Sequence, residues 1–216
     1  VAWWRFDEGS GTVARDASGN GNDGTVVGAE WHEGGWNGAG HCLEFIYGQA
    51  DRVAIENNMD VVGAGITITA WIHPHTFSQH DARVISKSST AATADGHWWM
   101  VSTNNGANVR FRLKTDESAT TLTLIDTAGV LVTGEWQFIT AMWDGAAATT
   151  HVDTVETGRA AKGGTAVAVD GSVPVAIGNL ANLTWILLWH YLWIGASLVA
   201  MLVLLATLVV VYLRLR

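Results

Sequence analysis

Hydrophobic and polar residues alternate along many short stretches of residues 1–180. In residues 109–115 three apolar residues alternate with three basic ones, and residues 66–72 follow a similar pattern. Successive side chains of a β-strand point to opposite faces, so this period of two predicts strands that bury one face. We therefore expect Val109, Phe111 and Leu113 to contact a core and the basic residues between them to contact water.

Apolar runs of this kind recur along the chain, with Gly- and Asn-rich turns between them. We expect strands at residues 2–7, 24–31, 42–48, 51–56, 66–74, 83–88, 98–104, 109–115, 121–127, 136–144, 149–156, 165–171 and 174–179. The composition fits this pattern, since 24 Gly and only 2 Pro suit short strands joined by tight turns. Many short strands at this spacing predict an all-β sandwich of two antiparallel sheets over residues 1–180.

The C-terminal part has a different pattern, because residues 185–213 contain no Asp, Glu, Lys or Arg. Such a run is longer than the roughly 20 apolar residues that span a bilayer. Residues typical of membrane interfaces lie at its two ends: Trp185, Trp189, Trp193, Tyr212, Arg214 and Arg216. We expect a linker at 181–184, a single transmembrane α-helix at 185–213 and a tail at 214–216.

Charge divides the chain in the same way. All 20 Asp and Glu precede residue 181 and two of the 12 Lys and Arg follow it, which leaves 10 − 20 = −10 on the first part. This acidity argues against nucleic acid as a partner. Positive residues favour the cytoplasmic side, so Arg214 and Arg216 predict a single-pass protein with a cytoplasmic C-terminus. The domain would then lie in the periplasm or at the cell surface, which requires an export signal that the given sequence does not show.

The order of the segments "WWRFDEGSGTVARDASGNGNDGTVVG", "ITITAWIHP", "GEWQFITAMWDG" and "VPVAIGN" resembles the laminin-G-like, concanavalin-A-like jelly-roll modules of secreted bacterial proteins. The resemblance covers about residues 2–179 and implies two stacked antiparallel sheets that bind carbohydrate or protein without catalysis. It also implies a closing strand after "VAIGN", which this sequence replaces with the apolar segment. We therefore expect an open sheet edge, or an edge that something else covers.

Four oxygen-bearing side chains occupy every second position of one loop: Asp16, Ser18, Asn20 and Asn22. Calcium prefers oxygen ligands from such a loop. The resemblance implies calcium here together with an Asp of the closing strand, which is absent. The alternative is an Asx-rich turn whose side chains bind their own backbone.

No catalytic motif stands out elsewhere. His73, His75 and His80 lie close in sequence, but only Asp81 could extend them to a zinc site, so a solvated loop is the simpler interpretation. The sequence has neither a G-x-S-x-G motif nor acidic residues at alternate positions of one strand. We expect a protein that is not an enzyme.

Several tryptophans lie within the strand patterns. Trp3, Trp71, Trp136 and Trp143 are expected in the core. Trp98 and Trp99 are adjacent, so they must point to opposite faces, and an exposed Trp would indicate an interface.

The apolar segment carries a stripe of mostly small residues at helical spacing, namely Ala196, Ala200, Val203 and Thr207. Such stripes let membrane helices approach closely, although chance also produces them. His190 lies on another face, where it would reach the interface or ligate bacteriochlorophyll or haem.

Two functions remain open. The first is a structural subunit of a membrane complex, whose helix packs on partner helices. The second is a cell-surface lectin that binds carbohydrate. The short linker at 181–184 restricts the domain to the membrane surface and favours the subunit.

Overall fold

The computed structural model describes residues 2–46, 48–57, 59–78, 80–89, 94–127 and 129–178. The chain divides into two compact units, Val1–Leu180 and Ala181–Arg216. The second unit lies outside the described residues, and so do the expected linker, transmembrane helix and cytoplasmic tail. Within the described ranges, no helix has the length and apolar character needed to cross a membrane.

The described part of the first unit is all-β, as predicted, with one short 3-10 helix. Its elements are β1 (Val13–Ala14), β2 (Gly24–Val27), β3 (Glu30–Glu33), β4 (His41–Glu44), β5 (Arg52–Ile55), β6 (Ile66–Ile72), β7 (Arg83–Ser88), η1 (Ala94–Gly96), β8 (His97–Asn104), β9 (Asn108–Thr115), β10 (Ser118–Ile125), β11 (Gln137–Trp143), β12 (Ala147–Val152), β13 (Val155–Ala161) and β14 (Val175–Gly178).

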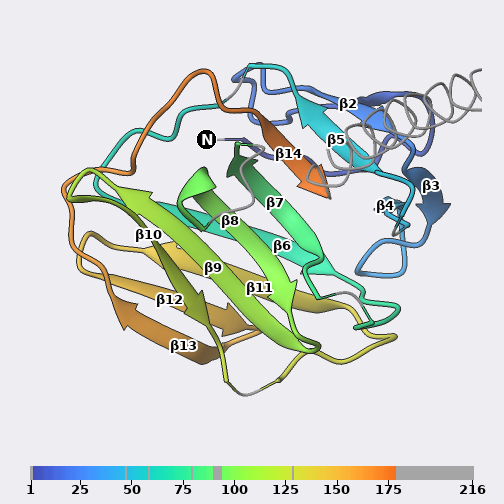
Figure 1. The fold of residues 1–216 in the computed structure, drawn as a ribbon. Helices are drawn as coiled ribbons and strands as arrows, with labels where there is room; N and C mark the ends of the chain where they lie inside the picture. Colours follow the sequence, from blue (N-terminus) through green and yellow to red (C-terminus); the bar gives the residue numbers. More distant parts are fainter. Residues whose placement is uncertain are drawn as a thin grey trace, which may run out of the picture. The chain divides into compact units, whose positions relative to one another are not determined.

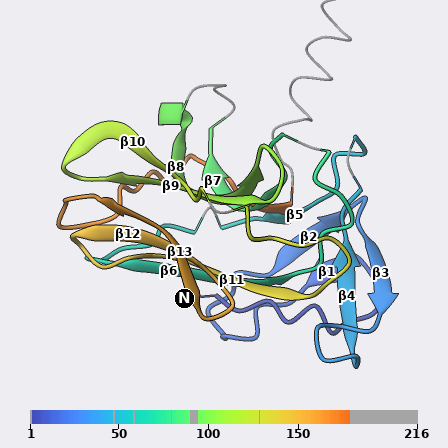
Figure 2. The ribbon, with the colours of Figure 1, turned by 90° about the horizontal axis from the view of Figure 1, so that it is seen from below.

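These strands form two main sheets and one hairpin (Figure 1). The eight-stranded sheet has the order β1-β2-β5-β14-β7-β8-β9-β10, the four-stranded sheet has the order β13-β12-β11-β6, and β3 pairs with β4. Figure 2 shows β7 to β10 as one layer and β6, β11, β12 and β13 as a second layer beneath it. The predicted sandwich of antiparallel sheets is confirmed.

The core lies between the two main sheets. Val109, Phe111 and Leu113 of β9 are at most 1% exposed, which confirms that they contact the core. The prediction that the basic residues between them contact water is wrong for Arg110, which is 4% exposed and pairs with Asp81. Trp99 of β8 and Trp143 of β11 are also 1% exposed. Burial of such large rings is a dominant favourable term in folding, because each removes roughly 150–250 Å² of surface from water.

Some predicted strands are wrong in extent. Residues 149–156 are not one strand, because the chain turns at Asp153, whose φ is 54°, between β12 and β13. Residues 24–31 are divided between β2 and β3 at Gly28, whose φ is 80°. Residues 165–171 form only a bridge from Val167 to Thr115. Gly28 and Asp153 adopt a positive φ, but each lies within a stretch that reads as one continuous strand in the sequence. The hydrophobic pattern alone therefore did not mark these turns.

The predicted N-terminal strand at 2–7 is reduced to one bridge between Trp4 and Asp16. Phe6 has a φ of 56°, which interrupts an extended conformation.

Among the described residues, β6 is an edge strand of the four-stranded sheet. The inward side chains of β6 after Ile66 are only half-buried, whereas those of its neighbour β11 are buried.

Candidate functional site

Exposed aromatic rings gather on the outward face of the four-stranded sheet. Trp71 of β6 and Phe138 of β11 are register partners, and their ring centroids lie 5.1 Å apart at 48°. Trp36 comes from the loop between β3 and β4 and stacks on Trp71, with centroids 4.6 Å apart and planes at 6°. Trp36 is 54% exposed and Trp71 is 39% exposed. These rings therefore form a contiguous apolar surface that solvent reaches.

The prediction that Trp71 lies in the core is wrong, and the alternation itself explains why. Ile66, Ile68 and Ala70 point inward, so the next residue must point outward. Trp3 was also predicted in the core and is 58% exposed. It belongs to the N-terminal segment, which forms no extended strand.

Other tryptophans follow the predictions more closely. Trp143 is buried in the core as expected. The predicted core position of Trp136 is wrong, because it is half-buried and shares the outward phase of Phe138. Trp99 is buried and Trp98 is half-buried, which confirms that this adjacent pair points to opposite faces.

A tight loop holds Trp36 in place. Gly34 donates its N–H to Gly40 O (3.0 Å), and Gly35 donates to Ala39 O (2.9 Å). A further bond runs from Gly38 N to Gly35 O, with Gly38 at a φ of 76°. Gly tolerates this left-handed conformation without steric cost, so the turn can close and hold the backbone of Trp36 where its ring stacks on Trp71.

Imidazole rings extend the aromatic cluster. The ring centroids of His73 and Trp136 lie 5.3 Å apart, and those of His73 and His75 lie 5.4 Å apart. Glu44 accepts from His75 Nδ1 (3.1 Å) and from His32 Nε2 (2.8 Å). In the ranges that the structure describes, no three His, Cys, Asp or Glu side chains are placed to hold a metal ion. We call Trp36, Trp71, Phe138, Trp136 and His73 the aromatic cluster.

The loop predicted to bind calcium is organised around the carboxylate of Asp16. Its Oδ1 accepts the backbone N–H groups of Trp3 and Ser18, both at 2.9 Å. Its Oδ2 accepts the backbone N–H (3.0 Å) and the side-chain amide (2.8 Å) of Asn22. Burial alone raises the pKa of this carboxyl, but the hydrogen bonds from Ser18, Trp3 and Asn22 outweigh burial and hold the pKa well below its usual range.

The other predicted ligands are also engaged within the protein. Ser18 Oγ accepts from Asn20 Nδ2 (3.1 Å), and Asn22 Oδ1 accepts from Asn57 Nδ2 (2.5 Å). Both carboxylate oxygens of Asp16 accept hydrogen bonds from N–H groups, which is the arrangement that the Asx-turn alternative predicts. Calcium binding at this loop stays a prediction.

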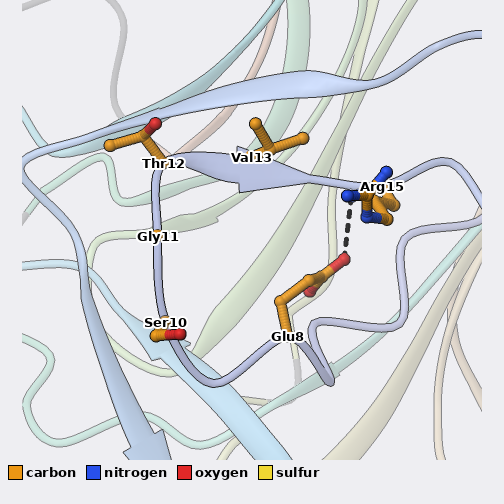
Figure 3. A pocket seen from close by; sticks show the side chains of 6 residues that line it. All are labelled: Glu8, Ser10, Gly11, Thr12, Val13 and Arg15. Carbon is orange, nitrogen blue, oxygen red and sulfur yellow. Dashed lines mark hydrogen bonds between the residues drawn. The ribbon is translucent and has the colours of Figure 1, made fainter.

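A shallow hollow lies beside this loop (Figure 3). It is lined by Glu8, Ser10, Gly11, Thr12, Val13 and Arg15. The carboxylate of Glu8 accepts the backbone N–H of Arg15 at 2.9 Å. The lining offers no aromatic ring, so we place the candidate site at the aromatic cluster instead.

The remaining predicted residues lie outside the described part of the chain. They are the interface residues Trp185, Trp189, Trp193, Tyr212, Arg214 and Arg216, the stripe of Ala196, Ala200, Val203 and Thr207, and the candidate ligand His190. Sequence reasoning did not single out Phe138. Ile139 and Ala141 point inward, so Phe138 must point outward. The alternation of apolar residues in the sequence could have predicted this.

Comparisons with known proteins agree with the fold. The family model described as the concanavalin A-like lectin/glucanases superfamily matches residues 47–185, more than half of the chain. No curated protein matches. Domain 4 of AbnA, a GH43 extracellular arabinanase from Geobacillus stearothermophilus in complex with arabinotriose, has a TM-score of 0.58 at 15% identity, covering 82% of this chain and 81% of that one.

Two further solved structures are similar to this chain over part of their own length. The binding domain of Paraclostridial Mosquitocidal Protein 1 has a TM-score of 0.56 at 12% identity, and the match covers 78% of this chain and 42% of that one. Domains LG4-5 of the mouse laminin alpha1 chain have a TM-score of 0.44 at 15% identity, covering 71% of this chain and 34% of that one. At these identities the likeness concerns the fold.

Proposed function

We propose that this chain, which belongs to the concanavalin A-like lectin/glucanases superfamily, is a non-catalytic carbohydrate-binding module. The exposed stack of Trp36 on Trp71, flanked by Phe138, is the observation that carries this proposal. An exposed apolar patch of this kind marks a binding surface on a soluble domain. The arabinotriose complex of the similar AbnA domain supports the proposal, since it shows that such a fold can hold an oligosaccharide.

The chemistry of the cluster suits a sugar ring. The C–H face of a sugar is apolar and flat, so it stacks on an indole in the way that Trp71 stacks on the other face of Trp36. His73 belongs to the cluster and His75 lies beside it, and their rings offer nitrogen atoms for hydroxyl groups of a sugar. Recognition would therefore combine a fixed apolar platform with a few polar contacts.

The cluster itself supports binding rather than hydrolysis. Glycosidases place two carboxylates about 5 to 9.5 Å apart on either side of the scissile bond. The aromatic cluster offers only aromatic and imidazole rings. The carboxylate of Asp153 accepts the backbone N–H of Phe138 at 3.0 Å, and that of Glu44 is paired with His32 and His75.

The expected membrane tail would place this module at the outer face of a membrane. A second candidate function, a subunit of a membrane complex, is supported by the edge strand β6. Within the described part of the chain its outer edge pairs with no strand, and the inward side chains of Ile68, Ala70 and Ile72 are half-buried, which suits coverage by a partner.

The test is calorimetric titration of neutral oligosaccharides, including arabinotriose, into the protein and three variants. We expect Trp36→Ala and Trp71→Ala each to weaken the binding of a recognised sugar by about tenfold or more, because each removes a stacking surface. Trp3→Ala is the matched control, since Trp3 is exposed but pairs with Arg5 outside the cluster. If no sugar binds, or if the control loses as much affinity, the proposal fails and the subunit function gains support.

A further inference from the structure

Three arginines lie close together on the outward face of the eight-stranded sheet. The inward phase of Phe111 and Leu113 turns Arg110 and Arg112 of β9 outward. In the strand register Ser102 of β8 lies between Arg83 of β7 and Arg110. Arg110 and Arg112 are two residues apart, so about 7 Å of strand separates them. Antiparallel pairing thus brings three guanidinium groups to one patch.

Contacts within the protein leave this patch positive. Arg110 is 4% exposed, pairs with Asp81 Oδ1 at 2.5 Å and donates from Nε to Ser102 Oγ at 3.1 Å. Arg83 donates to Ser88 Oγ at 3.0 Å, a neutral partner. Among the described residues Asp81 forms an ion pair with Arg110, and its charge also acts on Arg83 and Arg112, so one carboxylate faces three guanidinium groups.

Arg112 also has a neutral or weakly basic partner, because its Nη1 lies 3.1 Å from Nδ1 of His97. The Nε atoms of Arg83 and Arg112 are buried and have no hydrogen-bond partner within the described ranges. Burial is the main reason that the pKa of each of these two guanidinium groups is lowered. The charge of Arg110 adds to this lowering, and the charge of Asp81 opposes it. An anion placed beside these guanidinium groups would reduce the repulsion between their charges.

Neighbouring side chains on the same face border the arginines. Ser86 of β7 pairs with Ala176 of β14 and with Met100 of β8, and Met100 pairs with Arg112. Trp98 lies next along the sheet, and Lys114 Nζ is 4.5 Å from its ring centroid. A half-buried indole, a lysine and the buried side chains of Met100 and Ser86 therefore border the arginines.

We propose that Arg83, Arg110 and Arg112 bind the carboxylate of a uronic acid residue in an acidic oligosaccharide. The planar guanidinium fork matches the two oxygens of a carboxylate, and Trp98 offers a surface for the neighbouring sugar ring. This site lies on the other main sheet from the aromatic cluster, so it goes beyond the function proposed above. The net charge of −10 on residues 1–180 repels long anionic polymers. A short acidic oligosaccharide is repelled less, so it suits this site better.

The experiment uses the full chain in detergent, with trigalacturonate and its methyl ester as paired probes. The ester keeps the sugar and removes the negative charges. We expect the acid to bind at least tenfold more tightly than the ester. Arg83→Gln and Arg112→Gln should each weaken binding of the acid about tenfold and leave binding of the ester unchanged.

Three further variants make the result specific. Arg159→Gln removes an arginine from the four-stranded sheet, where it pairs with Glu156, and should leave binding of the acid unchanged. Arg112→Lys keeps the charge without the fork and should give an intermediate affinity. Trp36→Ala should leave binding of the acid unchanged. A failure of this proposal can therefore be distinguished from a failure of the carbohydrate site proposed at the aromatic cluster. Equal affinity of wild-type protein for acid and ester, or an equal loss in Arg159→Gln, would overturn the proposal, and the first outcome needs no variant to fold.

Discussion

One carboxylate, that of Asp16, holds the N-terminal segment against the loop at residues 16–22. It accepts four N–H groups, from Trp3, Ser18 and Asn22, and is 8% exposed. Hydrogen bonds to an ionised acceptor are roughly twice as strong as neutral ones. The ionised form is therefore the form that stabilises the fold, in agreement with the lowered pKa of this residue.

This linkage predicts a pH dependence at Asp16. Because its pKa is lower in the folded than in the unfolded state, its contribution is complete above the unfolded value of about 4 and is lost as the pH falls through the folded pKa. Asp16→Asn should lower the free energy of unfolding at pH 7 by about 1–3 kcal/mol. At pH 3 the difference from wild type should be smaller. Urea denaturation at both values checks this, and an unchanged difference would contradict it.

At the scale of elements, a buried lysine joins β7 to two distant loops. Lys87 points into the sandwich and its side chain is fully buried. Its Nζ lies 3.0 Å from Asp60 Oδ1 and donates to Val173 O at 2.9 Å. The loop before β6 and the loop before β14 therefore depend on one side chain of β7.

Replacement of Lys87 should be costly. Lys87→Ala should lower the free energy of unfolding by about 3–5 kcal/mol, because it removes one partner of a buried ion pair and leaves a cavity. Lys87→Met keeps most of the volume and should cost less. Asp60→Asn leaves the buried ammonium of Lys87 without its counter-charge, so it should also cost about 2–4 kcal/mol, although Asp60 itself is one-third exposed. Chemical denaturation of the three variants measures these values. A loss below about 1 kcal/mol in the alanine variant would refute the structural role of Lys87.

At the scale of the whole molecule, the C-terminal apolar segment leads to a topological prediction. If Arg214 and Arg216 keep the C-terminus in the cytoplasm, protease added to intact cells or spheroplasts should digest residues 1–180. A tag at the C-terminus should be protected until the membrane is broken. Immunoblots for the domain and the tag report both results. A protected domain with a digested tag would reverse the predicted orientation.

The sequence by itself determined the class of fold and the phase of its strands. Alternation is a local property of the chain, so it predicted that Val109, Phe111 and Leu113 face the core. The same phase placed Arg110 and Arg112 outward, and it would have placed Trp71 outward if it had been given priority over the hydrophobicity of the side chain. Strand limits such as the turn at Asp153 depend on positive φ, which the pattern does not encode.

Only the tertiary structure decided which outward residues meet. Trp36 stacks on Trp71 because the hairpin of β3 and β4 brings its loop to β6, and no periodicity within either segment specifies that contact. Arg83 lies near Arg110 because β8 pairs with both β7 and β9 in one particular register. Partner choice and register arise from the packing of the entire core, since a slip by one residue would turn each buried row to solvent. Both candidate sites are therefore consequences of long-range pairing, whereas the strands that carry them follow from local sequence.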